Sequence, residues 1–210
     1  MGDAGRERRI EVFADVYCPF AYAGLRRLLD RRYEVAGGFR LHVRAWPLEL
    51  VNGRPLRPLA VAREVEALRS QVVPQLFTGF DREAFPATTL PALALAASAY
   101  DVDLSTGEAV SMALRHALFE EGLDVSRPQV LAELAGAHRV PAPQAHHGDR
   151  VRADWEEGRR RGVVGSPHFF AGDRSFFCPA LGVDHGQDGL RVTPTDDVLS
   201  DLLDAIGTMG

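Results

Sequence analysis

The chain has 210 residues, of which 46% are hydrophobic and 25% are charged, a balance typical of a soluble globular protein and unlike that of a disordered chain. Its formal net charge of -5 argues against a general nucleic-acid-binding surface, which needs clustered basic charge. No apolar run reaches the ~18 residues that a membrane span requires, and residues 1–9 lack the apolar core of a secretory signal. We therefore expect a cytoplasmic protein with neither nucleic acid nor a membrane as a partner.

The first 52 residues show a strand pattern, a helix pattern and a second strand pattern. Apolar residues occupy every second position in Ile10–Val16 and again in Phe39–Ala45, which predicts two strands. A helix is expected between them, after Pro19, because apolar side chains recur on one of its faces, namely at Tyr22, Leu25, Leu28 and Leu29. This β-α-β order usually forms a right-handed parallel crossover.

Helical patterns then run from about residue 58 to residue 161. Thr88 or Thr89 is expected to cap an alanine-rich helix, and Ser126 to cap a helix that has Pro128 in its first turn. The alternating pattern returns in His168–Gly172 and Arg174–Cys178, which predicts a β-hairpin around a Gly-Asp turn. Gly182–Gly189 is expected to be a loop, and a last helix is expected from Thr195.

The predicted order is therefore β-α-β, a helical block, and β-β-α. Two halves of one sheet that flank a group of helices define an α/β arrangement with a lid-like second layer. We place the N-terminal half at residues 1–52, the helical insertion at 53–150 and the C-terminal half at 151–210.

Cys18 is the strongest candidate for a nucleophile. It stands where the first predicted strand ends and the first helix begins, with Pro19 in the first helical position. Unpaired backbone N–H groups and the helix dipole favour an anion there, so we expect a thiolate and a lowered thiol pKa. The alternative is a cysteine that only packs at the end of the strand.

A second candidate element, Gly165-Ser166-Pro167, directly precedes the predicted strand that begins at His168. A proline at the entry to a strand either follows a cis peptide bond, which exposes the preceding backbone toward a neighbouring loop, or starts the strand in trans. The residues alone leave both conformations open.

Two segments resemble a known family. The run Asp15-Val-Tyr-Cys18-Pro19-Phe20-Ala21-Tyr22 is similar to the active-site loop of DsbA-like thioredoxin-fold proteins, and in particular to that of their FrnE-like branch. The run from Gly162 to Phe170 resembles the cis-proline loop of that family. The run from Ala117 to Asp124, continued through Leu131 and Leu134-Ala135, is similar to its helical insertion. The resemblance implies a thioredoxin fold with an all-α helical insertion. It also implies that Cys18 faces Pro167, with a disulfide or a thiol ligand between them.

The chain departs from this family at one position. The loop of the FrnE-like branch has a second cysteine three residues after the first, and this chain has Ala21 there. The dithiol cycle, in which the second thiolate resolves a mixed disulfide, cannot run at that position. The segment is also similar to the Ser-Pro-Tyr-x-Tyr loop of 2-hydroxychromene-2-carboxylate isomerases and kappa-class glutathione transferases. In those relatives a serine in the place of Cys18 assists a bound glutathione.

Three residues near the loop have open roles. If the hairpin forms, Cys178 returns to about the level of Pro167. It then either resolves a mixed disulfide on Cys18 after a modest loop movement or packs as a small apolar residue on an edge strand. His168 either pairs with the Cys18 thiolate or points to the opposite face of the sheet. Asp15 either tunes proton transfer beneath Cys18 or is a solvated or capping carboxylate.

Three further groups of residues could bind a ligand, and each also has a structural explanation. The histidines that resemble a metal cluster lack the short spacing of a helical metal site, so we expect no metal at His138, His146, His147 and His185. Kappa-class relatives hold the γ-glutamyl end of glutathione with a Ser-Asp pair, and Thr195-Asp196 matches that pair, although an N-cap role explains it fully. Four aromatic residues either line a groove under the insertion or belong to the core, namely Phe20, Tyr22, Trp46 and Phe85.

We therefore expect a DsbA/FrnE-like thiol–disulfide oxidoreductase that acts through Cys18 and mixed disulfides. The alternatives are a thiol-cofactor-dependent isomerase or transferase and a redox-inactive binding module. The residues expected to bind the substrate or thiol are Pro19, Phe20, Tyr22, Ser166, Pro167, His168, Thr195 and Asp196. No tightly bound cofactor is expected, and a low-molecular-weight thiol such as glutathione is the candidate ligand. The expected partner is a small-molecule or protein thiol or disulfide, and a homodimer stays open.

Overall fold

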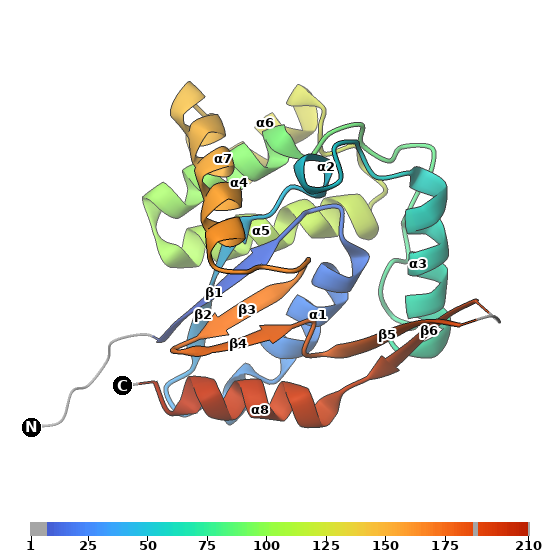
Figure 1. Cartoon of the computed structure of the whole chain (residues 1–210). Coiled ribbons are helices and arrows are strands. Elements are labelled where there is room, and N and C mark those ends of the chain that lie inside the picture. The colour runs from blue at the N-terminus through green and yellow to red at the C-terminus, as the bar shows by residue number, and fades with distance from the viewer. Residues whose placement is uncertain (1–7, 187–188, 210) are drawn as a thin grey trace, which may run out of the picture.

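The structure, a computed structural model, describes residues 8–186 and 189–209. A four-stranded sheet at its centre has the strand order β2-β1-β3-β4 (Figure 1). The bounds of these strands are Arg8–Ala14 for β1, Phe39–Ala45 for β2, His168–Ala171 for β3 and Arg174–Phe177 for β4. β1 pairs in parallel with β2, as expected for a β-α-β crossover, and antiparallel with β3. The predicted α/β fold class is confirmed.

Helices flank this sheet and occupy the chain between its two halves. Helix α1, Pro19–Asp30, and a short 3-10 turn, Arg32–Glu34, connect β1 to β2, while α8, Asp196–Gly207, packs against β3 (Figure 1). The helices between β2 and β3 are α2 (Leu48–Val51), α3 (Pro58–Gln71), α4 (Leu90–Val102), α5 (Leu104–Phe119), α6 (Pro128–Ala137) and α7 (Ala145–Arg160).

Helix α7 crosses the boundary that we expected between the insertion and the C-terminal half. A cut between residues 150 and 151 would divide this one continuous helix. The helix is also fastened to the sheet, because Asp154 accepts hydrogen bonds from the Arg44 guanidinium at 2.8 and 2.6 Å and from the Ala45 N–H at 3.1 Å. The helix therefore links the insertion to the sheet, because it packs against α4 as well as against β2.

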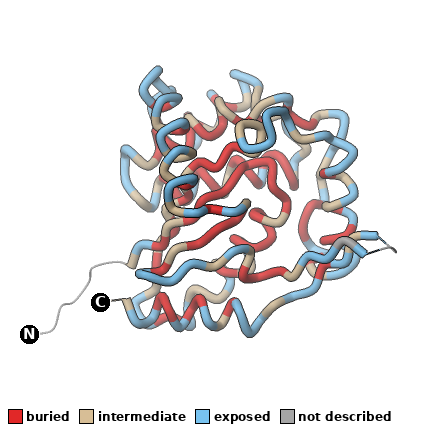
Figure 2. The backbone as a smooth tube through the Cα atoms, viewed as in Figure 1, coloured by how far each residue is buried: buried red, intermediate tan, exposed pale blue. Residues whose placement is uncertain are grey.

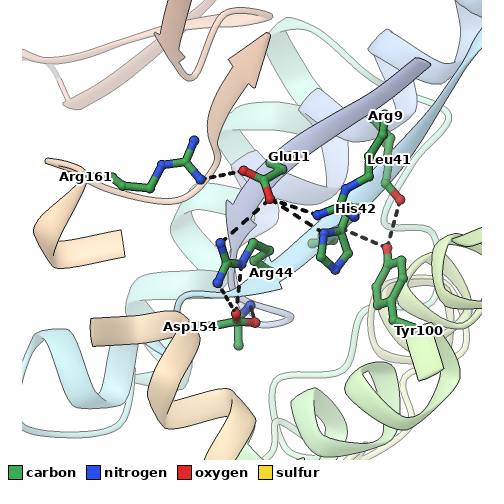
Figure 3. Close-up of polar contacts among 10 residues, drawn as sticks. Arg9, Glu11, Leu41, His42, Arg44, Tyr100, Asp154 and Arg161 are labelled. Carbon is green, nitrogen blue, oxygen red and sulfur yellow. Dashed lines mark hydrogen bonds and ion pairs between the residues drawn. The ribbon is translucent and has the colours of Figure 1, made fainter. Parts of the chain in front are cut away.

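Side chains of the helical block bond to the backbone of β2, the strand at the edge of the sheet. The Tyr100 hydroxyl of α4 donates to the Leu41 carbonyl at 3.0 Å and accepts from the Val43 N–H at 2.8 Å (Figure 3). Glu108 of α5 accepts from the Leu41 N–H at 2.7 Å. These contacts close an edge that would otherwise be free to pair with another chain.

Glu11 of β1 lies at the centre of a charged cluster (Figure 3). Its carboxylate contacts several basic side chains, namely Arg9, His42, Arg44 and Arg161. The contact with His42 and those with the arginines hold the pKa of Glu11 well below its ordinary value, although burial opposes them. The Arg161 guanidinium also lies 3.8 Å from the ring centre of Phe170. The cluster thereby fixes the start of the segment that leads from α7 to Pro167.

Gly182–Gly189 is not the loop that we expected. Leu181–Gly186 forms β5 and Gly189–Pro194 forms β6, and the two strands pair antiparallel as a separate two-stranded sheet. The side chain of Gln71 in α3 supports this sheet, accepting from the Val192 N–H at 2.8 Å and donating to the Leu190 carbonyl at 3.0 Å. Because this support comes from a side chain more than a hundred residues away, the local sequence gives little indication of the two strands.

Two of the expected helix caps differ from the structure. The N-cap of α6 is Arg127, while Ser126 instead binds the Asp124 carboxylate through its N–H and its hydroxyl. Thr195 does occupy the N-cap position of α8, but its hydroxyl donates to the Pro179 carbonyl at 2.7 Å. The N-cap explanation for Thr195 therefore applies to its position and not to its side chain.

The main hydrophobic core joins the sheet to α1, α3, α4, α5 and α8 (Figure 2). A second, smaller cluster is built around Phe13, Trp46 and Val163 and includes Phe170. Because Phe169 belongs to the main core, neighbouring residues of β3 serve different clusters, as the alternation of a strand requires. Among the described helices, none is long and apolar enough to cross a membrane.

Candidate active site

Cys18 is the N-cap residue of α1 and faces the loop that contains Pro167. Its Sγ atom donates a hydrogen bond to the Ser166 carbonyl at 3.1 Å and accepts one from the Ala21 N–H at 3.4 Å. Pro19 occupies the first helical position, as expected, where its missing N–H costs no intrahelical bond. The sulfur therefore lies between the first turn of a helix and the residue that precedes a proline.

The proline loop is held on both sides by backbone contacts. The Ser166–Pro167 peptide bond is cis. The Ser166 hydroxyl accepts from the Asp15 N–H at 3.0 Å, and the Pro167 carbonyl accepts from the Cys178 N–H at 3.0 Å. A Cβ atom added at Gly24 of α1 would lie 3.7 Å from the Pro167 ring, so the helix packs closely on this loop. The loop is thus fixed against the ends of β1 and β4 and against α1.

The environment of the Cys18 thiol differs from our expectation. The side chain is only 4% exposed, and burial raises its pKa from 9.0 to about 12. Its contacts with Ser166 and with the Ala21 N–H lower the pKa, but by less than burial raises it. The prediction of a lowered pKa was therefore wrong for the protein without a substrate. A helix N-terminus supplies one N–H to the sulfur, and the surrounding chain removes the water that would stabilise a thiolate.

We expect Cys18 in the folded protein to react with iodoacetamide at about pH 8 at least roughly 10-fold more slowly than in the urea-unfolded chain, because only the thiolate reacts. The measurement is the alkylation rate of the Cys18 peptide by mass spectrometry. Equal rates in the folded and unfolded chain would contradict the high pKa and the burial.

Asp15 is fully buried directly before this loop. Its carboxylate accepts from the Tyr17 N–H at 3.1 Å and from the Leu48 N–H. Burial raises its pKa from 3.8 to about 6, against the effect of these hydrogen bonds. Of the roles left open for Asp15, the structure shows the capping one, and the side chain is not solvated.

Arg115 of α5 is a buried residue that the sequence did not single out. It is 1% exposed, and its guanidinium donates to the Asp15 carbonyl at 3.1 Å and to the Ser111 carbonyl and hydroxyl at 2.8 and 2.7 Å. Burial lowers the pKa of Arg115, and the negative charge of the Asp15 carboxylate opposes this shift. The available signal was helical spacing, because Ser111, Arg115 and the buried Leu118 lie on one face of the helix.

His168 does not pair with Cys18. Its ring stacks on that of Phe170 at 4.9 Å, and its Nδ1 atom accepts from the Val164 N–H at 3.3 Å. Burial and the nearby Arg161 lower its pKa, which favours the neutral ring. Of the two orientations left open, the structure shows the one that points to the opposite face of the sheet.

Cys178 lies at the level of Pro167, as the predicted hairpin required. It follows β4, and its side chain is partly buried against the core cluster that contains Cys18. Both cysteines are free thiols. A negative charge on Cys178 would raise the pKa of Cys18, so the two sulfurs interact electrostatically. Burial raises the pKa of Cys178 to about 12 as well.

The remaining predicted binding residues divide into core and surface positions. Tyr22 is buried and stacks on Phe119 at 5.4 Å, and Phe85 packs against Tyr17 at 4.9 Å. Trp46 belongs to the smaller cluster with Phe13, and Phe20 packs at the border of the main core. The Asp196 carboxylate pairs with Arg27 near the C-terminal end of α1, the opposite end from Cys18. These contacts favour the core alternative for Tyr22, Trp46 and Phe85.

One group of potential metal ligands lies within the described residues, on α4 and α7. The ligand atoms of Asp101, His146 and His147 lie within 4.8 Å of one another. The Nδ1 atom of His147 accepts from the Gln144 N–H at 2.7 Å, so its proton lies on Nε2, which donates to Asp101 at 3.1 Å. A metal ion would need a lone pair on that Nε2 atom, where the proton lies instead. Arg150 also pairs with Asp101, and these contacts fit a helix N-terminus better than a cation site. The side chain of His185 lies outside the described part of the structure.

The fold and the site define a thioredoxin-type protein in which a cysteine at a helix N-terminus meets a cis-proline loop. A protein-family model described as a DSBA-like thioredoxin domain matches residues 9–190. The chain belongs to the DsbA-like thioredoxin family. A comparison with curated proteins gives no match.

Solved structures share this fold at low sequence identity. A probable DsbA oxidoreductase from Streptomyces coelicolor is 19% identical, with a TM-score of 0.71 over 96% of this chain and 91% of that chain. The cytosolic disulfide reductase DsbM from Pseudomonas aeruginosa is 19% identical, with a TM-score of 0.60 over 94% and 95%. A 2-hydroxychromene-2-carboxylate isomerase is 15% identical, with a TM-score of 0.57 over 80% and 88%. At these identities the likeness concerns the fold alone.

Proposed function

We propose that the protein is a cytoplasmic, FrnE-like thiol–disulfide oxidoreductase that acts through the single nucleophile Cys18 and forms mixed disulfides. The observation that carries this proposal is the position of the Cys18 sulfur, at the N-terminus of α1 and 3.1 Å from the carbonyl oxygen that precedes Pro167. The DsbA-like resemblance implies that a disulfide or thiol ligand lies at this junction. Ala21 in the place of a second cysteine favours a monothiol route.

In this route the Cys18 thiol loses its proton, and its sulfur attacks one sulfur of a disulfide substrate. One S–S bond forms as the S–S bond of the substrate breaks, and the leaving sulfur departs as a thiolate that takes up a proton. The Ala21 N–H, 3.4 Å from Sγ, supports the sulfur as it becomes anionic. A second thiol then attacks the mixed disulfide and returns Cys18 to its thiol form.

The proposed second thiol is a low-molecular-weight thiol such as glutathione. DsbM, which shares this fold, is described as a cytosolic disulfide reductase and is also known as a structure with GSH. Cys178 is an alternative second thiol, because its backbone is bonded to Pro167 and its sulfur interacts electrostatically with Cys18. A bond between the two sulfurs would need them to reach disulfide geometry.

Replacing Cys18 with serine is expected to abolish catalysed disulfide exchange, because the hydroxyl cannot form a mixed disulfide. The measurement is the glutathione-dependent reduction of bis(2-hydroxyethyl) disulfide, together with the mass of any trapped mixed disulfide. The matched control is Cys178→Ser, which should keep most of the activity if a free thiol resolves the intermediate. Loss of activity in the single variant Cys178→Ser would identify Cys178 as the resolving thiol. Exchange that survives in Cys18→Ser would contradict the proposal.

A thiol-cofactor-dependent isomerase or transferase is the second candidate, favoured by one observation. The high pKa keeps Cys18 a protonated hydrogen-bond donor, at the position where kappa-class and isomerase relatives have a serine. Such a group would orient a bound thiol rather than attack a disulfide. Saturable binding of glutathione, with Cys18→Ser still active on an electrophilic substrate, would favour this candidate over the first.

A further inference from the structure

The four-stranded sheet has one edge that the rest of the described chain leaves open. The opposite edge, β2, is closed by the side chains of Tyr100 and Glu108, and Gln71 bonds in the same way to β6 of the smaller sheet. Strand β4 is the last in the order β2-β1-β3-β4, and most of it is exposed (Figure 2). Among the described residues, only β3 is bonded to its backbone. Proteins usually close such an edge, because it can pair with another chain.

The pairing of β3 with β4 shows which backbone groups face this edge. In an antiparallel ladder, hydrogen-bonded pairs of residues alternate with pairs whose N–H and C=O groups point away from each other. The Cys178 N–H bonds to the Pro167 carbonyl, so Phe177, one residue earlier, belongs to a pair of the second kind, and by the same alternation so does Ser175. The N–H and C=O groups of Ser175 and Phe177 therefore point outward from the sheet.

This edge ends at the candidate active site. Phe177 is the last residue of β4 and is 54% exposed. A Cβ atom added at Gly165 would lie 2.6 Å from the Phe177 ring, so the ring covers the backbone directly before Ser166. Neighbouring strands lie about 4.8 Å apart, so a strand added beyond β4 would lie about 10 Å across the sheet from Pro167. About three extended residues span that distance.

The open stretch of β4 is too short to hold a partner by itself. It offers the outward groups of only two residues, Ser175 and Phe177, in a strand of 4 residues. A stable protein complex buries about 800 Å² on each partner, far more than one short strand edge presents. A partner at this edge therefore needs a second attachment. A mixed disulfide on Cys18 would supply it, because pairing at the edge then becomes intramolecular.

We propose that the edge of β4 binds an extended segment of a protein substrate as an additional strand, while Cys18 holds the half-cystine of that substrate. This inference rests on the proposed function and names its substrate class, namely polypeptides with an unfolded segment after the reactive half-cystine. Strand β4 runs toward the active site (Figure 1), so a segment that leaves the half-cystine in the C-terminal direction runs antiparallel to it. Its backbone meets the outward groups of Ser175 and Phe177.

The test uses synthetic peptides that carry thionitrobenzoate in a disulfide with an N-terminal cysteine. Attack by Cys18 releases the coloured thionitrobenzoate, which is the better leaving group, and leaves the peptide on Cys18. The long peptide has three linker residues and then four alternating threonines and valines. The control peptide is identical except that these four residues are N-methylated, which removes their N–H groups. In a Cys178→Ser background, the long peptide is expected to react roughly 10-fold faster, because its backbone bonds to the edge.

Two substitutions at Ser175 form the matched pair on the protein side. Proline removes the outward N–H and leaves the bonds between β3 and β4 in place, because proline is tolerated where the N–H of an edge strand faces solvent. Alanine removes only the hydroxyl. The ratio of the two peptide rates should fall to about one in Ser175→Pro and stay near that of the unsubstituted protein in Ser175→Ala.

Equal rates for the two peptides, or a ratio that Ser175→Pro leaves unchanged, would overturn the inference. Cys18-dependent reduction of bis(2-hydroxyethyl) disulfide would in that case leave the proposed function standing. If no disulfide reacts at Cys18, the proposed function fails, and NMR tests the edge with a millimolar long peptide that has serine in place of its cysteine. Shifts of the Ser175 and Phe177 amide signals would support pairing, and their absence would overturn it. A dimer that Ser175→Pro dissociates would assign the edge to a second copy of this chain and also overturn the inference.

Discussion

Replacing Ala21 with cysteine is expected to give the protein an internal disulfide that the natural sequence cannot form. Residues three apart on a helix are neighbours, and the Ala21 N–H already lies 3.4 Å from the Cys18 sulfur. After oxidation with excess glutathione disulfide, the intact mass of the variant should show an internal disulfide without bound glutathione, and that of the unsubstituted protein a glutathione mixed disulfide on Cys18. A glutathione mixed disulfide on Cys18 should also decay roughly 100-fold faster or more, because its resolution becomes intramolecular.

The double variant Cys18→Ser/Ala21→Cys is the matched control for this experiment. It adds the same thiol to the same buried position but has no sulfur at residue 18 to pair with it. After the same oxidation its mass should show no internal disulfide between residues 18 and 21. If the folded Ala21→Cys protein formed only a glutathione mixed disulfide on Cys18, residue 21 would not occupy the position of the family's second cysteine.

The sequence predicted the elements that carry their own local pattern. The bounds of β2 agree with the alternation of Phe39–Ala45, and α1 begins directly after Cys18. The sheet formed by β5 and β6 was missed because its support comes from Gln71 of α3. The boundary that we expected at residue 150 falls inside α7, because the largely charged surface of this helix does not show that it joins the insertion to the sheet.

The same distinction applies to the candidate site. The motif around Cys18 and the Ser166-Pro167 segment located both halves of the junction, since each is a short contiguous run. The pKa of the thiol was predicted in the wrong direction, because burial depends on how the whole chain surrounds the sulfur. Arg115 was missed for a related reason. It is a charged residue on a helix, and only packing shows that it faces inward.

Replacing Arg115 with methionine is expected to lower the free energy of unfolding by about 3–5 kcal/mol, the usual cost of leaving a buried charge without its partner. The guanidinium donates to the Asp15 carbonyl and to two oxygens of Ser111, and its charge favours the ionised form of the buried Asp15 carboxyl. Methionine fills much of the volume but supplies neither the charge nor the donors. Urea denaturation measures the effect, and Arg152→Met, at an exposed position of α7, should change stability by less than about 0.5 kcal/mol.

The loss should be larger at about pH 8 than at about pH 4, because it includes the ionisation of Asp15. The pKa of Asp15 in the folded protein, about 6, lies above its ordinary value of 3.8. Its protonated form therefore stabilises the fold below that ordinary value, and this contribution is lost as the pH rises through about 6. Without Arg115 the pKa of Asp15 rises further, so the variant continues to lose stability at a higher pH than the unsubstituted protein. Adding Asp15→Asn to Arg115→Met should remove most of this pH dependence. A loss that is equal at both pH values would mean that Arg115 acts through its hydrogen bonds and packing, and not through its charge beside Asp15.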